Sequence, residues 1–592
     1  MVEDTPVDFV IEASWEVANK VGGIYTVVQG HAQLLNERYD EYLCVGPLFP
    51  HTASKDFFEE PAPEHIRQTL EHLRLVGING VYGRWEVPGS PQAVLLDASH
   101  AQIDVDAVKG ELYERFGVDS LHAGFDFDEP VLWAWAVGMF IEELRSAVGT
   151  RLVAHLHEWM AGVAGLYVCA RGVDVGTVFT THATMLGRTI SGATEINLYQ
   201  ELSSLDPVVT ARDLGVLDKH TTEVACATYC DVFTTVSDIT ALEAEQLLGV
   251  KPAVVTYNGI SNENYPTMEE ASVLHAQSRE RIRDFLNYYF LSHYSFDLDE
   301  TLIFFTSGRY EYKNKGLDVF TDALGRLNAW MQDVGYAKTV VVFYWVPGEA
   351  HGIKTQVLEE RRVFRDLQSF VKGQQPQVVR RILRGSQNLS SLSCEELFDV
   401  EAREELRRLV SALGRRGTPP VCTHNLPRED EDAIIRSFRA NNLCNAESDR
   451  VKVVLQPVYL DGSDGLLDLP YEEAIAGTHL GVFPSYYEPW GYTPVEAAGY
   501  AVASVTTDLG GFGRFVQEEA SGGGVFVLSR KDRSYEEVVE ELFSVMQSYV
   551  ELDKHGRMEQ KLAAKRLTAR TQWETFIKYY FQAHAEAYES AR

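Results

Sequence analysis

The sequence predicts an α/β protein built from two doubly wound domains, each with a parallel sheet. Short apolar, β-branched runs alternate with helix-length segments along the whole chain, and this alternation is typical of parallel strands that are buried on both faces. The runs form two series, one before residue 260 and one after residue 300. The length of 592 residues also exceeds what one hydrophobic core normally organises.

Two sets of segments are predicted strands. The first series is VDFVIEA, EYLCVGP, AVLLDAS, RLVAHLH, GTVFTTH, DVFTTVS and AVVTYNG. The second series is TLIFFTSGR, TVVVFYWVP, VKVVLQPVY, LGVFPS, ASVTTD and GVFVLS. Because helix-length segments separate these strands, they are expected to form βαβ units.

The domain boundaries follow from the gap between the two series. The N-terminal domain is expected to span residues 1–270 and the C-terminal domain residues 271–572, with a hinge within 262–300. Residues from about 350 to 450 are rich in charge and helical periodicity, which indicates an inserted helical hairpin or subdomain. Residues 573–592 form a predicted last helix that crosses back to the N-terminal domain.

The composition excludes several classes of partner. The formal net charge of −33 argues against nucleic acid and anionic membranes. The longest apolar runs are well short of a membrane span, and the acidic start MVEDTPVDFV does not resemble a signal peptide. The 7 cysteines are scattered and odd in number, so no disulfide framework is expected. We therefore expect a cytoplasmic protein with a neutral or locally selected ligand.

Two loops at predicted strand ends are suited to a phosphate group. KVGGIYTVVQG opens a helix, and its paired glycines let a backbone come close to an anion. Such glycine turns serve plain strand-to-helix packing equally well, so both interpretations stay open. SGRYEYKNKG places Arg309 and Lys315 in a polar loop. They would offer a bidentate fork and a point charge to a diphosphate, and a solvated turn is the alternative.

Histidines also follow predicted strands. TTHATMLGR places His182 after a buried run, with Arg188 six residues later. HLHEW places His157 and Glu158 at a strand end. A metal site would need a third ligand, and none is evident in the sequence, so no metal is expected. DLGGFGRFV is a further glycine loop, whose amides would be able to form an anion nest.

The segment SYYEPWGYTPVEA carries two glutamates around a Pro-Trp-Gly turn. Glu488 follows a short buried strand, and its carboxylate would be costly to desolvate there unless it met a ligand. Glu496 falls in the first turn of the next predicted helix, where Thr493 and Glu496 match a capping box. Since ligands bind at the carboxyl ends of strands in open α/β sheets, Glu488 is the strongest candidate for a functional carboxylate.

In chain order, EVANKVGGIYTVV, HLHEW, FTTHATMLGR, SGRYEYKNKG, PPVCTHN and SYYEPWGYTPVEA resemble the glycogen synthases of the animal and fungal type. The likeness runs from about residue 8 to about residue 530 and more weakly beyond. The starch-synthase type is less similar, because its first loop typically reads Lys-Thr-Gly-Gly. The sequence shows no long serine-rich tail, which indicates a prokaryotic or otherwise tail-less member.

The resemblance implies a retaining glucosyltransferase of the GT-B architecture, with two Rossmann-like domains facing across a cleft. It would transfer glucose from UDP-glucose to the 4-hydroxyl at the non-reducing end of glycogen or another α-1,4-glucan, with no metal or organic cofactor. An ADP-glucose-dependent synthase shares this chemistry and is the alternative enzyme. A phosphorylase would need a pyridoxal-phosphate lysine. A non-catalytic glucan-binding scaffold would not need the complete set of charged residues.

Matching the family motifs residue by residue implies a site. The expected catalytic residues are Glu488, His182, Arg309 and Lys315. The expected nucleotide-sugar-binding residues are Lys20, Gly22, Gly23, Arg188, Asn258, Tyr471, Trp490, Gly491, Thr493 and Glu496. In this match His182 lies beside the hydroxymethyl group of the donor sugar, and Tyr471 stacks on uracil. Backbone amides of Trp490 and Gly491 bind sugar hydroxyls.

The match also assigns the charged groups. Glu488 orients the donor glucose and stabilises an oxocarbenium-like sugar, either as a covalent nucleophile or during front-face attack. Arg309 and Lys315 clamp the diphosphate and neutralise its charge on departure, with help from Arg188. Glu496 holds the nucleotide ribose while also capping its helix.

The segment DKHGRMEQKLAAKRLTAR corresponds to the arginine-rich helix that binds glucose-6-phosphate in activated relatives. Lys554, Arg557, Lys561 and Lys565 share one helical stripe. Only three arginines remain in the segment, and lysine cannot grip a phosphate bidentately. We interpret the stripe as a solvated helix face and expect little activation. The insertion at about 350–450 resembles the family's oligomerisation segment, so we expect a homo-oligomer, with a homotetramer as the reasonable form.

Overall fold

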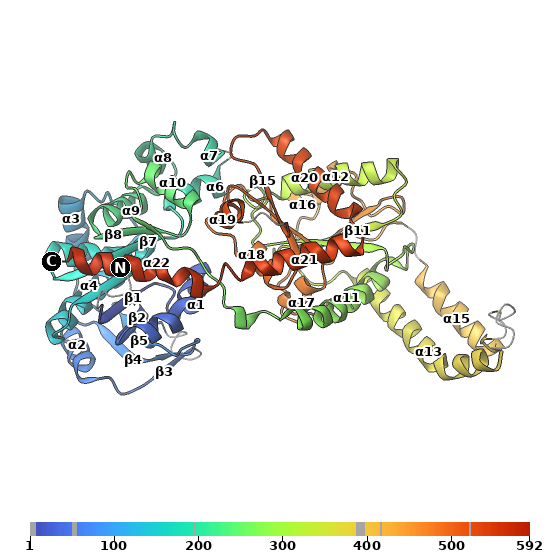
Figure 1. Ribbon diagram of the computed structural model, residues 1–592, viewed down its shortest axis with the longest axis horizontal. Coiled ribbons are helices and arrows are strands. Elements are labelled where there is room, and N and C mark those ends of the chain that lie inside the picture. The colour runs from blue at the N-terminus through green and yellow to red at the C-terminus, as the bar shows by residue number, and fades with distance from the viewer. Residues whose placement is uncertain are drawn as a thin grey trace.

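The computed structural model describes residues 7–49, 56–194, 196–385, 393, 397–414, 417–519 and 523–591. It contains two mostly parallel sheets, each with helices on both faces (Figure 1). The first sheet lies in the N-terminal part of the chain, and the second is formed between residues 301 and 528. The predicted fold class, two doubly wound α/β domains, is confirmed. We call the first sheet with its helices the N-terminal domain and the second sheet with its helices the C-terminal domain.

The first sheet has the strand order β3-β4-β5-β2-β1-β6-β7-β8-β9. Its predicted strands are observed as parallel neighbours: β1 (Phe9–Ala13), β2 (Glu41–Pro47), β5 (Gln92–Asp97), β6 (Leu152–His157), β7 (Val175–Thr181), β8 (Val232–Thr235) and β9 (Val254–Val255). Two antiparallel strands were not predicted: the edge strand β3 (Phe57–Glu59) and its neighbour β4 (Asn79–Trp85). β3 is short and β4 contains glycines and partly exposed positions, so neither shows the continuous apolar run of a central strand.

The second sheet has the order β12-β11-β10-β13-β14-β15, and every pair in it is parallel. Its strands are β10 (Thr301–Ser307), β11 (Thr339–Trp345), β12 (Val451–Gln456), β13 (Leu480–Val482), β14 (Ala503–Thr507) and β15 (Val525–Leu528). The chain first builds outward from β10 on one side and then outward from β13 on the other. The strand order therefore reverses between β10 and β13, and such a switch point is where open α/β sheets bind ligands.

The helices of the N-terminal domain are α1 (Gly23–Arg38), α2 (Glu64–Leu75), α3 (Val105–Phe116), α4 (Phe125–Ala147), α5 (Glu158–Arg171), α6 (Met185–Ala193), α7 (Leu198–Glu201), α8 (Pro207–Asp213), α9 (Leu217–Tyr229) and α10 (Asp238–Leu247). Those that follow are η2 (Asn262–Asn264), α11 (Met268–Phe290), α12 (Leu317–Asp333), α13 (Thr355–Gly385), α15 (Val400–Leu413), α16 (Ala433–Ala440), α17 (Tyr471–Ala476), α18 (Tyr492–Gly499), α19 (Gly511–Glu519), α20 (Tyr535–Glu551), α21 (Lys554–Thr568) and α22 (Trp573–Ser590).

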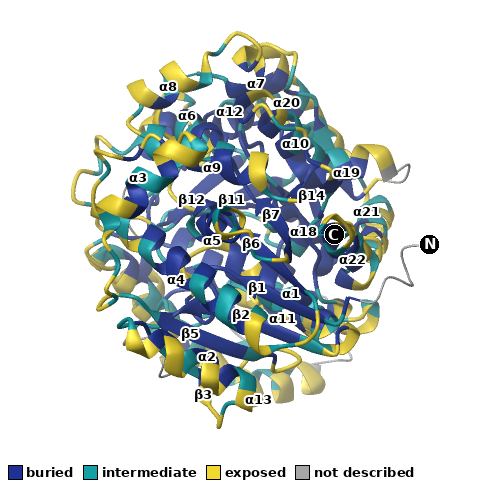
Figure 2. Cartoon of the chain, turned by 90° about the vertical axis from the view of Figure 1, so that its left-hand side faces the viewer, coloured by how far each residue is buried: buried dark blue, intermediate teal, exposed yellow. Residues whose placement is uncertain are grey.

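Apolar layers cover both faces of each sheet, as expected for parallel strands. In β1, Val10 belongs to one layer and Ile11 to the layer on the opposite face, because successive side chains alternate. Figure 2 shows the buried strands at the centre of the N-terminal domain and exposed residues on the outer helices. This packing fixes the strand ends on which the candidate site residues lie.

The last helix, α22, runs back across the N-terminal domain (Figure 1). It contributes Trp573, Ile577 and Tyr580 to an apolar layer of the first sheet. The two chain crossings between the domains lie side by side: Ile260 N donates to Thr571 O at 2.9 Å, and Trp573 N donates to Ile260 O at 3.1 Å. The two connections between the domains therefore meet at one place.

The helices α13 and α15 pack against each other and project from the C-terminal domain as a hairpin (Figure 1). Apolar side chains lie exposed on it, including Val400 (59% exposed) and Val410 (52%). Within the described ranges, no helix is both long enough and apolar enough to cross a membrane.

Candidate active site

Two of the expected catalytic residues meet at the switch point of the second sheet. Lys315 lies in the loop after β10, and Glu488 lies in the loop after the neighbouring strand β13. Lys315 Nζ donates to Glu488 Oε2 at 2.6 Å. The side chains keep 19% and 24% of their exposure, respectively. The pair is therefore sheltered, yet still accessible to a ligand.

The loop that carries Glu488 is held by its own backbone and by the following glycine loop. Gly511 N donates to Glu488 O at 3.2 Å, and Phe512 N donates to Trp490 O at 2.8 Å. Gly491 has a φ of 101°, and a Cβ there would lie 3.2 Å from Glu488 Cγ. The interpretation of DLGGFGRFV as an anion nest is wrong for these amides, because they bind the backbone of the Glu488 loop.

Arg309 does not join the pair in this arrangement. Its side chain is 76% exposed and donates to Glu311 Oε1 at 3.0 Å. The long side chain starts from the same loop as Lys315. A role for Arg309 on a diphosphate therefore requires the ligand to draw the guanidinium away from Glu311.

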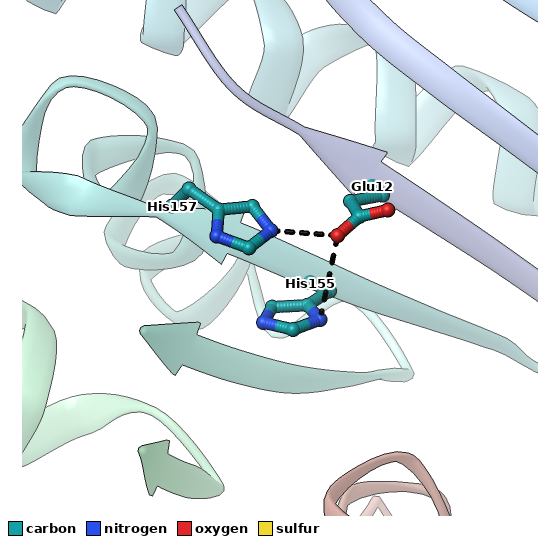
Figure 3. Close-up of side chains that lie close together, drawn as sticks. All are labelled: Glu12, His155 and His157. Carbon is teal, nitrogen blue, oxygen red and sulfur yellow. Dashed lines mark hydrogen bonds and ion pairs between the residues drawn. The ribbon is translucent and has the colours of Figure 1, made fainter. Parts of the chain in front are cut away.

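On the N-terminal domain, His182 ends a chain of buried hydrogen bonds. His157 Nε2 donates to Glu12 Oε1 at 2.7 Å (Figure 3). His157 Nδ1 then accepts from His182 Nε2 at 2.9 Å. Glu12 also accepts from His31 at 2.9 Å and from the hydroxyl of Tyr42. Burial, followed by the nearby His157, holds the pKa of His182 well below its usual value, so this imidazole is neutral.

Glu12, His155 and His157 form the one group in the described residues with the composition of a metal site. The structure therefore brings a third possible ligand to the histidines that was not evident in the sequence. Glu12 is distant in sequence, and it becomes the neighbour of His155 through the β1–β6 register. His155 donates or accepts at both nitrogens, with His584 at 3.0 Å and Thr180 at 2.7 Å. A metal ion would have to displace this network.

Glu158 lies behind His182 and is held in an unusual backbone conformation. Its φ is +62°, a value that side-chain-bearing residues adopt mainly at functional or strained positions. Glu158 Oε1 accepts from His182 N at 3.0 Å. Burial raises the pKa of Glu158, while the charge of Arg188 on α6 opposes this rise.

The glycine loop before α1 is occupied by a carboxylate of the protein itself. Glu16 Oε2 accepts from Gly22 N and from Tyr25 N, both at 2.8 Å. A Cβ at Gly22 would lie 3.0 Å from Glu16 Oε1, whereas one at Gly23 would meet nothing within 4 Å. Lys20 Nζ lies 5.6 Å from the centre of the Tyr25 ring. Sequence reasoning missed Glu16, although it lies six residues before Gly22.

The expected nucleotide side of the site lies around α17 and α18. Tyr471 OH and Ser307 Oγ share a hydrogen bond of 2.7 Å. Burial, followed by the charge of Glu472, raises the pKa of Glu496 to about 7. The predicted capping box is wrong: α18 begins at Tyr492, its N-cap is Gly491, and no side chain caps it. The left-handed conformation of Gly491 places the N-cap two residues before Thr493, the N-cap that the sequence suggested.

Trp490 and Asn258 lie in the buried region between the domains. The Trp490 ring packs against Tyr257 and Phe576, with ring centres 5.7 and 5.9 Å apart, so its side chain belongs to the core. Asn258 is 4% exposed, and its Oδ1 has no hydrogen-bond partner in the described structure. That oxygen suits a ligand hydroxyl.

The stripe on α21 is not wholly a solvated face, which corrects the interpretation of that helix: Lys554 is exposed, but Arg557, Lys561 and Lys565 are partly buried. Lys554, Arg557 and Lys561 line a pocket of about 450 Å³. The other charged or titratable lining residues are Arg279, Arg283, Asp299, Glu300, Lys338 and His479. Burial, together with Arg279 and Arg557, lowers the pKa of Lys561 to about 7. Lys565, the fourth member, donates to Gly499 O at 2.9 Å.

A family model described as glycogen synthase matches residues 12–592. The chain belongs to the glycogen synthase family. A glycogen [starch] synthase from Neurospora crassa is 36% identical over 594 residues, covering 98% of this chain and 83% of that relative. The corresponding protein of Caenorhabditis elegans is 36% identical over 584 residues, covering 97% and 87%. The liver protein of Mus musculus is 35% identical over 589 residues, covering 98% and 84%. These matches confirm the family that the motifs indicated.

The fold also has a solved counterpart. The catalytic domain of starch synthase IV from Arabidopsis thaliana, bound to ADP and acarbose, matches with a TM-score of 0.52 at 13% sequence identity. The match covers 98% of this chain and 100% of that chain. At this identity the likeness concerns the fold alone, and it confirms the GT-B architecture of this glycogen synthase family member.

Proposed function

We propose that this protein is a UDP-glucose-dependent glycogen synthase that adds glucose to the non-reducing 4-hydroxyl of an α-1,4-glucan with retention of anomeric configuration. The observation that carries the proposal is the 2.6 Å contact of Lys315 with Glu488 at a sheet switch point. The contact supports the proposal because a departing diphosphate and a developing sugar cation need stabilisation by a positive and a negative charge, respectively. Membership of the glycogen synthase family supports the glucan acceptor.

The residues would act as follows. The Glu488 carboxylate stabilises the oxocarbenium-like sugar and orients the donor, and a leaving phosphate oxygen takes the proton from the acceptor hydroxyl in front-face attack. Lys315 moves from Glu488 toward the diphosphate as negative charge develops there, and Arg309 joins it from the same loop. Neutral His182 offers a ring nitrogen to a sugar hydroxyl. No metal or organic cofactor has a role in this sequence of events.

The identity of the nucleotide needs its own experiment, because the sugar chemistry does not depend on it. We expect kcat/KM with UDP-glucose to exceed that with ADP-glucose, measured with glycogen as the acceptor. A preference for ADP-glucose would establish the alternative synthase. Absence of transfer from either donor, with intact glucan binding, would favour a binding scaffold.

We also propose that the α13–α15 hairpin forms the contact of a cytoplasmic homo-oligomer, with a tetramer as the expected form. The exposed Val400 and Val410 on a projecting hairpin support this assignment. The mass of the oligomer can be measured by light scattering for the wild-type protein and for Val410→Glu. A charge at an apolar interface should lower the oligomer mass, and an unchanged mass would place the contact elsewhere.

A further inference from the structure

A buried carboxylate joins the two domains next to the candidate site. Glu243 lies on α10 of the N-terminal domain and is fully buried. Its Oε1 accepts from Thr184 Oγ1 at 2.5 Å, from Thr184 N at 3.2 Å and from Tyr487 OH at 3.0 Å. Its Oε2 accepts from Tyr199 OH at 3.0 Å. Thr184 and Tyr199 belong to the same domain as Glu243, whereas Tyr487 comes from the C-terminal domain.

The surroundings of Glu243 are closely packed. A Cβ at Gly187 would lie 2.2 Å from Glu243 Oε1, so α6 reaches the carboxylate only because this residue is glycine. The rings of Tyr199 and Tyr487 stack with their centres 6.2 Å apart. Both tyrosines belong to an apolar cluster that spans the two domains and includes Leu186 and Leu509. Hydrogen bonds to a carboxylate are stronger in such a dry environment.

α10 also binds Pro489, which follows Glu488 in the chain as Tyr487 precedes it. Pro489 O accepts from Ser237 Oγ at 2.5 Å and from Thr240 Oγ1 at 3.5 Å. Ser237 is the N-cap of α10, and Thr240 lies in its first turn. The N-terminal domain therefore forms hydrogen bonds with the backbone of Pro489 and with the side chain of Tyr487. These two residues are the neighbours of Glu488 in the chain.

We propose that Glu243 is a positioning residue that fastens Tyr487 to the N-terminal domain and so sets the place of Glu488 relative to His182 and Arg188. Thr184, whose hydroxyl also donates to Glu243, lies between His182 and Arg188 in the chain. One carboxylate thus connects the segments that carry site residues from both domains. This inference rests on the proposed function, because it concerns the geometry of that site.

The bond between Glu243 and Tyr487 exists only while the domains hold this arrangement. Losing it lowers the fraction of molecules in which both halves of the site are aligned, and the apparent rate constant falls with that fraction. Misplacement of reacting groups by a small distance is also costly to the chemical step. We expect the loss to appear in kcat/KM without a matching loss of folding stability.

Two tyrosines make a matched test. Tyr487→Phe and Tyr199→Phe each remove one hydroxyl from the same carboxylate, but only the first removes a contact between domains. Tyr487→Phe should lower kcat/KM for UDP-glucose by about 10-fold, the loss of one hydrogen bond to a buried carboxyl group whose pKa burial raises to about 7. Tyr199→Phe should keep kcat/KM near the wild-type value, although its change in melting temperature should be comparable to that of Tyr487→Phe. Glu245→Gln, an exposed neighbour on α10, controls for the helix.

A double-mutant cycle and a structural readout complete the experiment. The effects of Glu243→Gln and Tyr487→Phe on kcat/KM should be less than additive, because both break the same contact. Small-angle X-ray scattering with saturating UDP should show a larger radius of gyration for Tyr487→Phe than for Tyr199→Phe. The proposal would be overturned if the two tyrosine variants lost kcat/KM equally and in proportion to their loss of melting temperature. Equal radii of gyration for the two variants would also overturn it. If the wild type transfers no glucose, the proposed function fails, while scattering still decides the role of Tyr487.

Discussion

Glu488 and Lys315 carry opposite charges where the proposed reaction separates charge. Glu488→Gln keeps the shape of the side chain and removes its negative charge. We expect the fold to remain intact and kcat to fall by about 10²-fold or more, because the electrostatic stabilisation of the sugar cation is lost. Steady-state kinetics together with circular dichroism measure the two effects. Turnover near that of the wild type would remove Glu488 from the centre of the mechanism.

The basic residues of the same loop should act on the leaving group. We expect Arg309→Ala and Lys315→Ala each to weaken the transition state by roughly 3 kcal/mol, because the proposed mechanism brings both side chains to the developing diphosphate. The measurement is kcat/KM at two salt concentrations. Arg428→Ala is the matched control, because Arg428 is 79% exposed and pairs with Glu431 at 3.2 Å, much as Arg309 pairs with Glu311. A loss in the control equal to that in Arg309→Ala would mean that only bulk charge matters.

Glu496 gives the site a dependence on pH. Burial, followed by Glu472, raises its pKa to about 7, and in the proposed role the ionised form would accept hydrogen bonds from the ribose hydroxyls. As the pH falls from 8 to 6 the carboxylate takes up a proton, so KM for UDP-glucose should rise. Glu496→Gln should raise KM at pH 8 with a smaller effect on kcat, and its KM should change less over this range. A variant with the same pH profile of KM as the wild type would contradict the assignment.

Several of the predicted site residues lie in loops that follow an apolar strand at its carboxyl end, as Lys315 follows β10 and Glu488 follows β13. Glu488 and Lys315 could be predicted to meet, because the carboxyl ends of parallel strands gather at one sheet edge. The carboxylates of Glu12, Glu16 and Glu243 were missed. Glu12 meets His155 through strand register and Glu243 meets Tyr487 across domains, and neither contact leaves a local pattern in the chain.

At the scale of elements, continuous β-branched runs predicted the central strands, because burial on both faces favours apolar residues at most positions. The edge strand β3 and its neighbour β4 do not show such runs and were missed. The start of α18 was placed too late, because the positive φ of Gly491 lets the chain enter the helix directly after the Glu488 turn. The helical spacing correctly predicted that the basic residues of α21 lie on one stripe. That the stripe lines a pocket is visible only in the tertiary structure.

The basic residues of that pocket lead to a prediction about glucose-6-phosphate. It gathers lysines and arginines, but the pKa of Lys561 is lowered to about 7 by burial, Arg279 and Arg557, so Lys561 is only partly charged at neutral pH. We expect glucose-6-phosphate to raise activity little at saturating UDP-glucose and pH 8. The small effect should grow at pH 6, where Lys561 is protonated. A titration at both pH values measures this, with Arg566→Ala as an exposed control on α21.

Strong activation at pH 8 that is lost in Arg557→Ala would show that the remaining basic residues suffice for the effector. Strong activation abolished by Arg566→Ala or Arg570→Ala would point to the outer part of the helix. Either result would contradict the expectation of a constitutively active enzyme.

At the scale of the whole molecule, the reaction depends on how two separately built sheets face each other. The crossings at Ile260 and Thr571 are hydrogen-bonded to each other, and α10 holds the turn on both sides of Glu488. The sequence predicted two doubly wound sheets, because the strands of each sheet appear in the chain as a separate series of apolar runs. It could not predict their relative placement, which depends on a few polar contacts between distant residues.

The product of the reaction tests the central claim most directly. Wild-type protein is given UDP-glucose with ¹³C-labelled glucose and a maltooligosaccharide acceptor, and the new linkage is identified by NMR. Our account predicts an α-1,4-linked glucose at the non-reducing end, formed about 10²-fold or more slowly by Glu488→Gln. A β-linked product, transfer to another hydroxyl, or no transfer by the wild type would contradict it.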